Sequence, residues 1–190
     1  PTSVDSEVAM VVETSGSTNR PKRVWHTVSS LRAAAEQVNA ELHGRGVWWQ
    51  ALPAHYIAGV MVTVRALYSG SVVLSRQSGE TLLENVLHFV QHTSTEFPTL
   101  PMFTSLVPKQ LAELIDAARK ETVVAEALSS FSRVLVGGQQ VPEEMINAAR
   151  DLGVPVTRTY GAAETAGGCV WDGRPLTGTD VDTRQNRIAL

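Results

Sequence analysis

Short continuous apolar runs alternate along this chain with stretches in which apolar residues recur every three or four positions. The second pattern is clearest between Val28 and Leu42, behind the candidate N-cap Thr27 and ahead of Gly44, a typical residue after a helix end. The continuous runs have the character of buried strands. The patterns predict strands over 8–12, 47–52, 71–74, 99–107, 133–136, 156–160 and 169–171, and helices over 28–42, 60–68, 80–92, 108–114, 121–128 and 142–153.

The regular alternation of strands and helices predicts the fold class. It is typical of an α/β protein with a mainly parallel sheet and helices on both faces. After residue 172 the pattern changes to short alternating stretches, which indicate antiparallel strands at the C-terminal end. We therefore divide the chain into an α/β domain over 1–172 and the beginning of a β-rich segment over 173–190.

Three loops follow predicted strands and contain most of the polar chemistry. Residues 13–24 are predicted to form a loop between a buried strand and a helix, and residues 54–59 and 161–168 are predicted to form two more. In a parallel sheet, ligands bind where the loops after the strands converge. We therefore expect a single site at that edge of the sheet.

Composition narrows the class of protein. The 190 residues are 43% hydrophobic and 18% charged, which suits one ordinary globular domain with a sizeable core. A net charge of −3 gives no reason to expect binding to nucleic acid or to an anionic membrane. No apolar run reaches the roughly 20 residues of a membrane span, and no signal-peptide pattern is present.

Two further features concern the setting of the chain. The single cysteine, Cys169, excludes an internal disulfide and suits a reducing compartment, so we expect a cytoplasmic protein. The sequence begins at Pro1 without a methionine and stops within an apparent strand at 187–190. Because domains seldom end inside an element, we expect a piece of a longer protein.

A polar segment after the first predicted strand contains candidate phosphate ligands. Residues 14–22 read Thr-Ser-Gly-Ser-Thr-Asn-Arg-Pro-Lys and combine hydroxyl groups, a glycine backbone and a lysine. Backbone N–H groups, hydroxyls and an ammonium group are donors that bind a polyphosphate. The order of residues is not that of a Walker loop, and the same residue types also form ordinary turns.

Two other segments offer contacts for a nucleotide. Gly137-Gly138-Gln139 follows an apolar strand, and paired glycines let a flat ligand approach the backbone, although they also suit a plain turn. In the segment 160–165, the ring of Tyr160 can stack on a purine and Glu164 can bind Mg²⁺ beside phosphate oxygens. An exposed glutamate in a loop of small residues is the simpler alternative.

Taken together, these segments resemble the adenylate-forming superfamily of acyl- and aryl-CoA ligases, luciferases and peptide-synthetase adenylation domains. The resemblance lies in the family's phosphate loop at 14–22, its strand-Gly-Gly segment ending at 139, its Tyr-Gly-x-Thr-Glu motif at 160–164 and its Leu-Pro-x-x-His-x-x-Gly segment at 52–59. Softer similarity over 104–111 and 160–173 narrows it to the o-succinylbenzoate–CoA ligases of the menaquinone pathway. The likeness covers nearly the whole chain, as the central part of the family's large N-terminal domain.

The resemblance implies an activity in two steps. An aromatic carboxylic acid reacts with ATP to give an acyl-adenylate and pyrophosphate, and CoA then displaces AMP. ATP, Mg²⁺, CoA and the acid are the implied ligands. The implied nucleotide-binding residues are Thr14, Ser15, Gly16, Ser17, Thr18, Lys22, Gly137, Gly138, Gln139, Tyr160, Gly161, Glu164 and Thr165. Among them Thr18, Lys22 and Glu164 are the implied catalytic residues, with Glu164 as metal ligand, and the implied acyl-pocket residues are His55, Tyr56, Gly59, Gly167 and Gly168.

Several departures from the family pattern keep two alternatives open. The family usually has Gly at Asn19, a hydroxyl residue at Ala163 and the pocket histidine at Tyr56, whereas His55 lies one place earlier. The ribose-binding aspartate and the mobile C-terminal lysine have no counterpart, so we expect this piece to be inactive alone. The alternatives are another acyl- or aryl-CoA ligase and a non-catalytic nucleotide-binding module.

Overall fold

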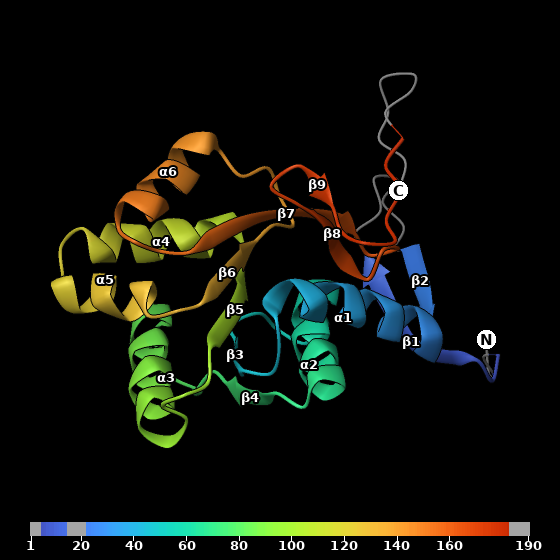
Figure 1. Cartoon of the computed structure of the whole chain (residues 1–190), viewed down its shortest axis with the longest axis horizontal. Helices are drawn as coiled ribbons and strands as arrows, with labels where there is room; N and C mark the ends of the chain where they lie inside the picture. Colours follow the sequence, from blue (N-terminus) through green and yellow to red (C-terminus); the bar gives the residue numbers. More distant parts are fainter. Residues whose placement is uncertain (1–4, 15–21, 183–190) are drawn as a thin grey trace.

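The computed structural model describes residues 5–14 and 22–182 (Figure 1). Strands and helices alternate along most of this length. In chain order the elements are β1 (Val8–Thr14), β2 (Lys22–Thr27), α1 (Val28–Leu42), β3 (Val47–Gln50), α2 (Ile57–Ser69), β4 (Val72–Ser75), α3 (Leu82–Glu96), β5 (Met102–Leu106), α4 (Pro108–Ala118), α5 (Thr122–Ser129), β6 (Arg133–Val136), α6 (Glu143–Asp151), β7 (Val156–Ala162), β8 (Gly167–Trp171) and β9 (Arg174–Pro175).

One large sheet organises the molecule. Its strand order is β4-β3-β5-β6-β7-β8-β9. The strands from β4 to β7 pair in parallel, and β8 and β9 add antiparallel pairs at one edge. The predicted α/β class, the mainly parallel sheet and the antiparallel C-terminal strands are confirmed.

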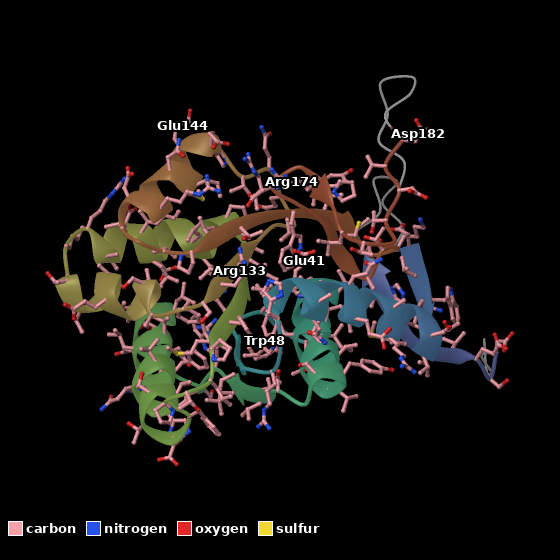
Figure 2. The ribbon with its side chains drawn as sticks, viewed as in Figure 1. Glu41, Trp48, Arg133, Glu144, Arg174 and Asp182 are labelled. Carbon is pink, nitrogen blue, oxygen red and sulfur yellow. The ribbon has the colours of Figure 1, made fainter. Side chains whose placement is uncertain are left out.

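Helices cover both faces of this sheet (Figure 1), as the strand–helix alternation predicts. Helices α1 and α2 lie on one face, and α3 to α6 lie on the other. The consecutive residues Trp48 and Trp49 of β3 supply both cores, because neighbouring side chains on a strand point to opposite faces. Trp48 packs against Phe103 with ring centroids 5.3 Å apart, and Trp49 against Phe89 at 6.0 Å. Figure 2 shows Trp48 beside α2.

The first strand differs from its prediction. Residues 22–27 form β2, which pairs antiparallel with β1 in a separate two-stranded sheet. The predicted loop over 13–24 is therefore wrong at both ends, because residues 13–14 belong to β1 and residues 22–24 to β2. Strand β1 is not buried either, since Val12 is its only buried residue and Val11 is 41% exposed. A two-stranded ribbon has one covered face, and on β2 that face holds Val24 and His26.

Two predicted loops are shorter than expected. Helix α2 begins at Ile57, so Gly59 lies inside its first turn, where an added Cβ would overlap the carbonyl group of Pro53. Strand β7 runs on to Ala162 and β8 begins at Gly167, which leaves a four-residue turn over 163–166. Over residues 5–14 and 22–182, no helix combines the length and apolar character that crossing a bilayer requires.

Candidate active site

The carboxyl ends of β5, β6 and β7 meet at a cavity of about 260 Å³. The start of α2 and the strands β7 and β8 close it, and Thr14 at the end of β1 reaches its rim. Three segments that are far apart in the sequence therefore converge here, as expected for a parallel sheet. The lining residues are Thr14, Leu52, Ile57, Ala58, Arg65, Ser105, Leu106, Leu135, Gly137, Gly138, Thr159, Gly161, Ala162, Ala163, Gly167, Gly168 and Trp171.

Glycines make part of the cavity wall out of backbone. An added Cβ at Gly137 would lie 2.6 Å from the carbonyl oxygen of Thr159, and one at Gly168 would lie 2.7 Å from the Cβ of the same residue. A Cβ at Gly161 would overlap the carbonyl group of Gly167. Real side chains do not fit at such distances, so strands β6, β7 and β8 approach one another only because these positions are glycine. The wall they form presents peptide groups to a ligand.

A salt bridge joins the two sheets beside this cavity. Lys22 Nζ, at the start of β2, donates to Glu164 Oε1 in the turn after β7 over 2.5 Å. Both side chains are about half exposed, at 61% and 48%. The hydrogen bond from Lys22 is the main cause that lowers the pKa of the Glu164 carboxyl group below its ordinary value, and a backbone N–H adds to it. Glu164 is therefore an ionised carboxylate held beside the lysine of the candidate phosphate loop.

This carboxylate suits a magnesium ion that brings most of its own ligands. Mg²⁺ is usually held by one or two carboxylates together with substrate phosphates and water. Within residues 5–14 and 22–182, no group of three His, Cys, Asp or Glu side chains could hold a metal by itself. The surroundings of Glu164 therefore fit a metal–phosphate complex and not an all-protein metal cage.

Only some of the remaining predicted residues line the cavity. Residues 15–18 and Asn19 of the candidate phosphate loop lie outside the described residues. Tyr160 is 48% exposed and does not line the cavity; it lines a separate hollow together with Arg158 and Asp172. Gln139 is exposed, and only its neighbours Gly137 and Gly138 line the cavity.

Two groups of predicted residues have local roles in the fold. His55 and Tyr56 are exposed and their ring centroids lie 4.2 Å apart, while the next residues, Ile57 and Ala58, line the cavity. Thr165 Oγ1 accepts a hydrogen bond from the Ala162 N–H over 2.9 Å and lies 2.7 Å from the Gly167 carbonyl oxygen. Its hydroxyl closes the turn and points into the backbone.

The cavity also contains polar groups that sequence reasoning missed. Arg65 of α2 is 4% exposed, and its Nε has no hydrogen-bond partner among the described residues. The same holds for the buried Ser105 Oγ on β5 and Trp171 Nε1 on β8, and all three residues line the one cavity. Buried polar groups normally have partners, so three such groups around one cavity indicate a polar ligand.

Arg65 is the strongest of these signals. Burial lowers its pKa to about 10, and no described carboxylate forms an ion pair with it. Its guanidinium carbon lies 6.0 Å from the centre of the Trp48 ring. The sequence offered one signal, a single arginine within the otherwise uncharged helix α2.

The family is settled by a direct match. Residues 1–188 match the family described as AMP-binding enzyme. The chain belongs to this family. The resemblance to adenylate-forming enzymes is thereby confirmed over nearly the whole sequence.

Known members of the AMP-binding family extend well beyond this chain. A probable 2-succinylbenzoate–CoA ligase of Mycobacterium tuberculosis (strain CDC 1551 / Oshkosh) is 38% identical over 177 residues, which cover 92% of this chain and 44% of that protein. The o-succinylbenzoate coenzyme A synthetase of Bacillus subtilis, in complex with ATP and magnesium ion, has a TM-score of 0.74 at 22% identity, over 95% of this chain and 38% of that one. Its complex with the acyl-adenylate intermediate OSB-AMP has a TM-score of 0.75 at 22% identity, over 95% and 37%. The chain thus spans less than half the length of these relatives.

Proposed function

We propose that the full-length protein containing this segment is an o-succinylbenzoate–CoA ligase. It activates the acid with ATP to an acyl-adenylate and transfers the acyl group to CoA, as a step of menaquinone biosynthesis. The name of the 38%-identical relative supports the reaction. We place the reaction in the cytoplasm, where the single thiol Cys169 stays reduced.

The buried cation Arg65 is the observation that carries this choice of substrate. A cation in a cavity without a partner is costly, and a ligand carboxylate removes that cost. o-Succinylbenzoate has two carboxylates, so one can be activated while the other pairs with Arg65. We assign the ring carboxylate to Arg65, with Ser105 Oγ and Trp171 Nε1 as neutral donors beside it. A fatty acid or benzoate has no second carboxylate and would leave Arg65 uncompensated.

The nucleotide occupies the other side of the cavity in this proposal. The backbone at Gly137 and Gly138 receives the adenine, with the ring of Tyr160 alongside. Lys22 and the loop before it bind the β- and γ-phosphates. The complex of the Bacillus subtilis synthetase with ATP and magnesium supports this set of ligands.

In adenylation, Lys22, Glu164 and the apolar lining of the cavity have different roles. Lys22 exchanges its partner Glu164 for phosphate oxygens, which places positive charge where negative charge accumulates as pyrophosphate leaves. The carboxylate of Glu164 is thereby released for Mg²⁺, which supplies further charge neutralisation when bound. The apolar part of the lining, with Leu106 and Leu135, limits the access of water to the mixed anhydride. CoA enters the second step as the nucleophile.

A comparison of two acids tests the proposal. ATP–pyrophosphate exchange is measured on the full-length protein with o-succinylbenzoate and with 3-benzoylpropionate, which lacks the ring carboxylate. We expect kcat/KM to be about 100-fold higher for the dicarboxylate, since a buried charge-assisted contact contributes on the order of 1.5–3 kcal/mol or more. Equal rates, or faster exchange with benzoate or a fatty acid, would contradict the assignment and favour another acyl-CoA ligase. No exchange with any acid would favour a non-catalytic nucleotide-binding module.

A further inference from the structure

The turn that carries Glu164 is anchored to β2 at a second point. His26 Nε2 lies 2.9 Å from the carbonyl oxygen of Ala163, and His26 is only 3% exposed. A carbonyl oxygen only accepts hydrogen bonds, so His26 Nε2 is protonated and is the donor. Lys22 and His26 lie on the same face of β2, because side chains alternate along a strand. One face of β2 therefore contacts two consecutive residues of the turn.

The turn also has hydrogen bonds of its own. The Ala166 N–H donates to the carbonyl oxygen of Ala163 over 3.1 Å, which closes the turn. The hydroxyl of Thr165 bridges the backbone of Ala162 and Gly167. These bonds lie within residues 162–167. What His26 adds is the position of the turn relative to β2.

The separation of the two sheets makes that position important. Strands β1 and β2 form their own sheet, whereas the turn belongs to the seven-stranded sheet. The Lys22–Glu164 bridge is exposed and holds the turn weakly. In the proposed reaction it also has to open, so that Glu164 can bind Mg²⁺ and Lys22 can bind phosphate. The buried bond from His26 remains when the bridge opens.

We propose that His26 is a positioning residue for adenylation. Its hydrogen bond to Ala163 keeps Glu164 close to β2 when the Lys22 bridge is open. The inference rests on the proposed function, in which Glu164 and Lys22 act on the metal–phosphate end of ATP. His26 itself contacts the turn and not the substrate.

Matched variants of the full-length protein test this role by ATP–pyrophosphate exchange. In His26→Gln the amide nitrogen can reach the place of Nε2, whereas in His26→Asn it falls short. We expect His26→Ala to raise KM for Mg·ATP about tenfold, the effect of losing one buried hydrogen bond, and to change KM for the acid by less than about twofold. His26→Gln should restore most of the loss and His26→Asn little of it. Val24→Ala, on the same buried face of β2, should leave the ratio of the two KM values unchanged.

Kinetic outcomes of two kinds would overturn the proposal. One is an equal rise of both KM values in His26→Ala, which would indicate general damage to the fold. The other is a failure of His26→Gln to exceed His26→Asn, which would show that the donor at Nε2 is not what matters.

Amide hydrogen exchange separates this inference from the proposed function. In the same full-length variants, exchange of the 162–166 amides should be about tenfold faster in His26→Ala than in wild type, and unchanged in Val24→Ala. This measurement needs no acid substrate. Faster exchange in a protein that activates no acid would refute the ligase assignment and keep the anchoring role. Unchanged exchange in His26→Ala would refute the anchoring role whichever acid is activated.

Discussion

The two ends of the site hold charge in opposite ways. At the end that the proposed function assigns to the acid, Arg65 is buried and has no described ion-pair partner. At the phosphate end, Lys22 and Glu164 are half exposed and paired with each other. A buried charge without a counter-ion is stabilised when a ligand of opposite charge binds to it. An exposed ion pair can exchange its partners at little cost in free energy, because water solvates the separated charges. Under the proposed function, the buried end selects the acid and the exposed end binds the phosphates of ATP.

Removing the buried charge should have the largest effect on activity. It is also the most direct test of the difference between the two ends. In the full-length protein, Arg65→Leu should lower kcat/KM for o-succinylbenzoate about 100- to 1,000-fold, because a buried charge pair is lost. It should leave KM for ATP within about twofold. The measurement is ATP–pyrophosphate exchange with each substrate varied in turn. Arg65→Lys is the matched control, since it keeps a cation but loses the planar group of donors.

The stability of the Arg65→Leu variant tests whether the buried charge serves substrate binding and not the fold. Burial lowers the pKa of Arg65 to about 10, so the charged form is disfavoured in the folded state. The midpoint of urea unfolding without ligand should therefore be unchanged or higher in the variant. A clear fall in the midpoint would show that Arg65 stabilises the fold, and the drop in activity could then not be assigned to the substrate.

At the exposed end, Glu164→Ala should have the next largest effect. We expect the adenylation rate to fall about 10- to 100-fold, the usual range for weakening a metal site. Transfer to CoA should fall less, because pyrophosphate has already left. The two steps are measured separately by supplying the acyl-adenylate for the second one. Equal losses in both steps would contradict a metal role confined to the first.

A smaller effect is expected from the neutral donors at the buried end. Trp171→Phe keeps an aromatic ring in the wall but removes the indole N–H, which lacks a partner among the described residues, together with part of the ring volume. KM for o-succinylbenzoate should rise about fivefold, as for one neutral hydrogen bond, while KM for 3-benzoylpropionate should not change. An equal rise for both acids would indicate altered packing.

The smallest effect is expected on the stability of the protein when the exposed pair is removed. The pKa of Glu164 is lowered, chiefly by the hydrogen bond from Lys22, from an ordinary value of 4.5. A lowered carboxyl pKa contributes stability above the ordinary value, and that contribution is lost as the pH falls through the folded-state pKa. Glu164→Gln should therefore have a slightly lower urea midpoint than wild type at pH 7, and the difference should disappear in acid. A large difference at pH 7 would show that the bridge is a structural element.

Local patterns were sufficient for much of the fold. The helix over 28–42 and the strand over 133–136 have the predicted bounds, because period and capping are properties of adjacent residues. The paired glycines at 137–138 and the segment at 160–164 pointed to the cavity on their chemistry and resemblance. They line it or adjoin it because loops that follow parallel strands meet at one edge.

Other features depended on contacts between distant parts of the chain. Residues 22–27 form a strand because β1 pairs with them and because the turn after β7 covers one face, and neither condition is visible in the local pattern. Gly59 lies inside α2, where the Pro53 carbonyl group packs so closely that it leaves no room for a side chain. Such contacts are set by packing, which overrides local propensity.

What the sequence determined by itself is the family, the order of most elements and the chemistry available at the site. Tertiary structure decided which of that chemistry is buried and what it faces. Arg65 reads as an ordinary helical arginine until the fold encloses it in a cavity where no described carboxylate pairs with it. Lys22 and Glu164 are 142 positions apart, and only the docking of the two-stranded sheet brings them together. The physical reason is that burial and pairing of charge depend on the whole surroundings of a side chain, whereas secondary structure depends largely on its neighbours along the chain.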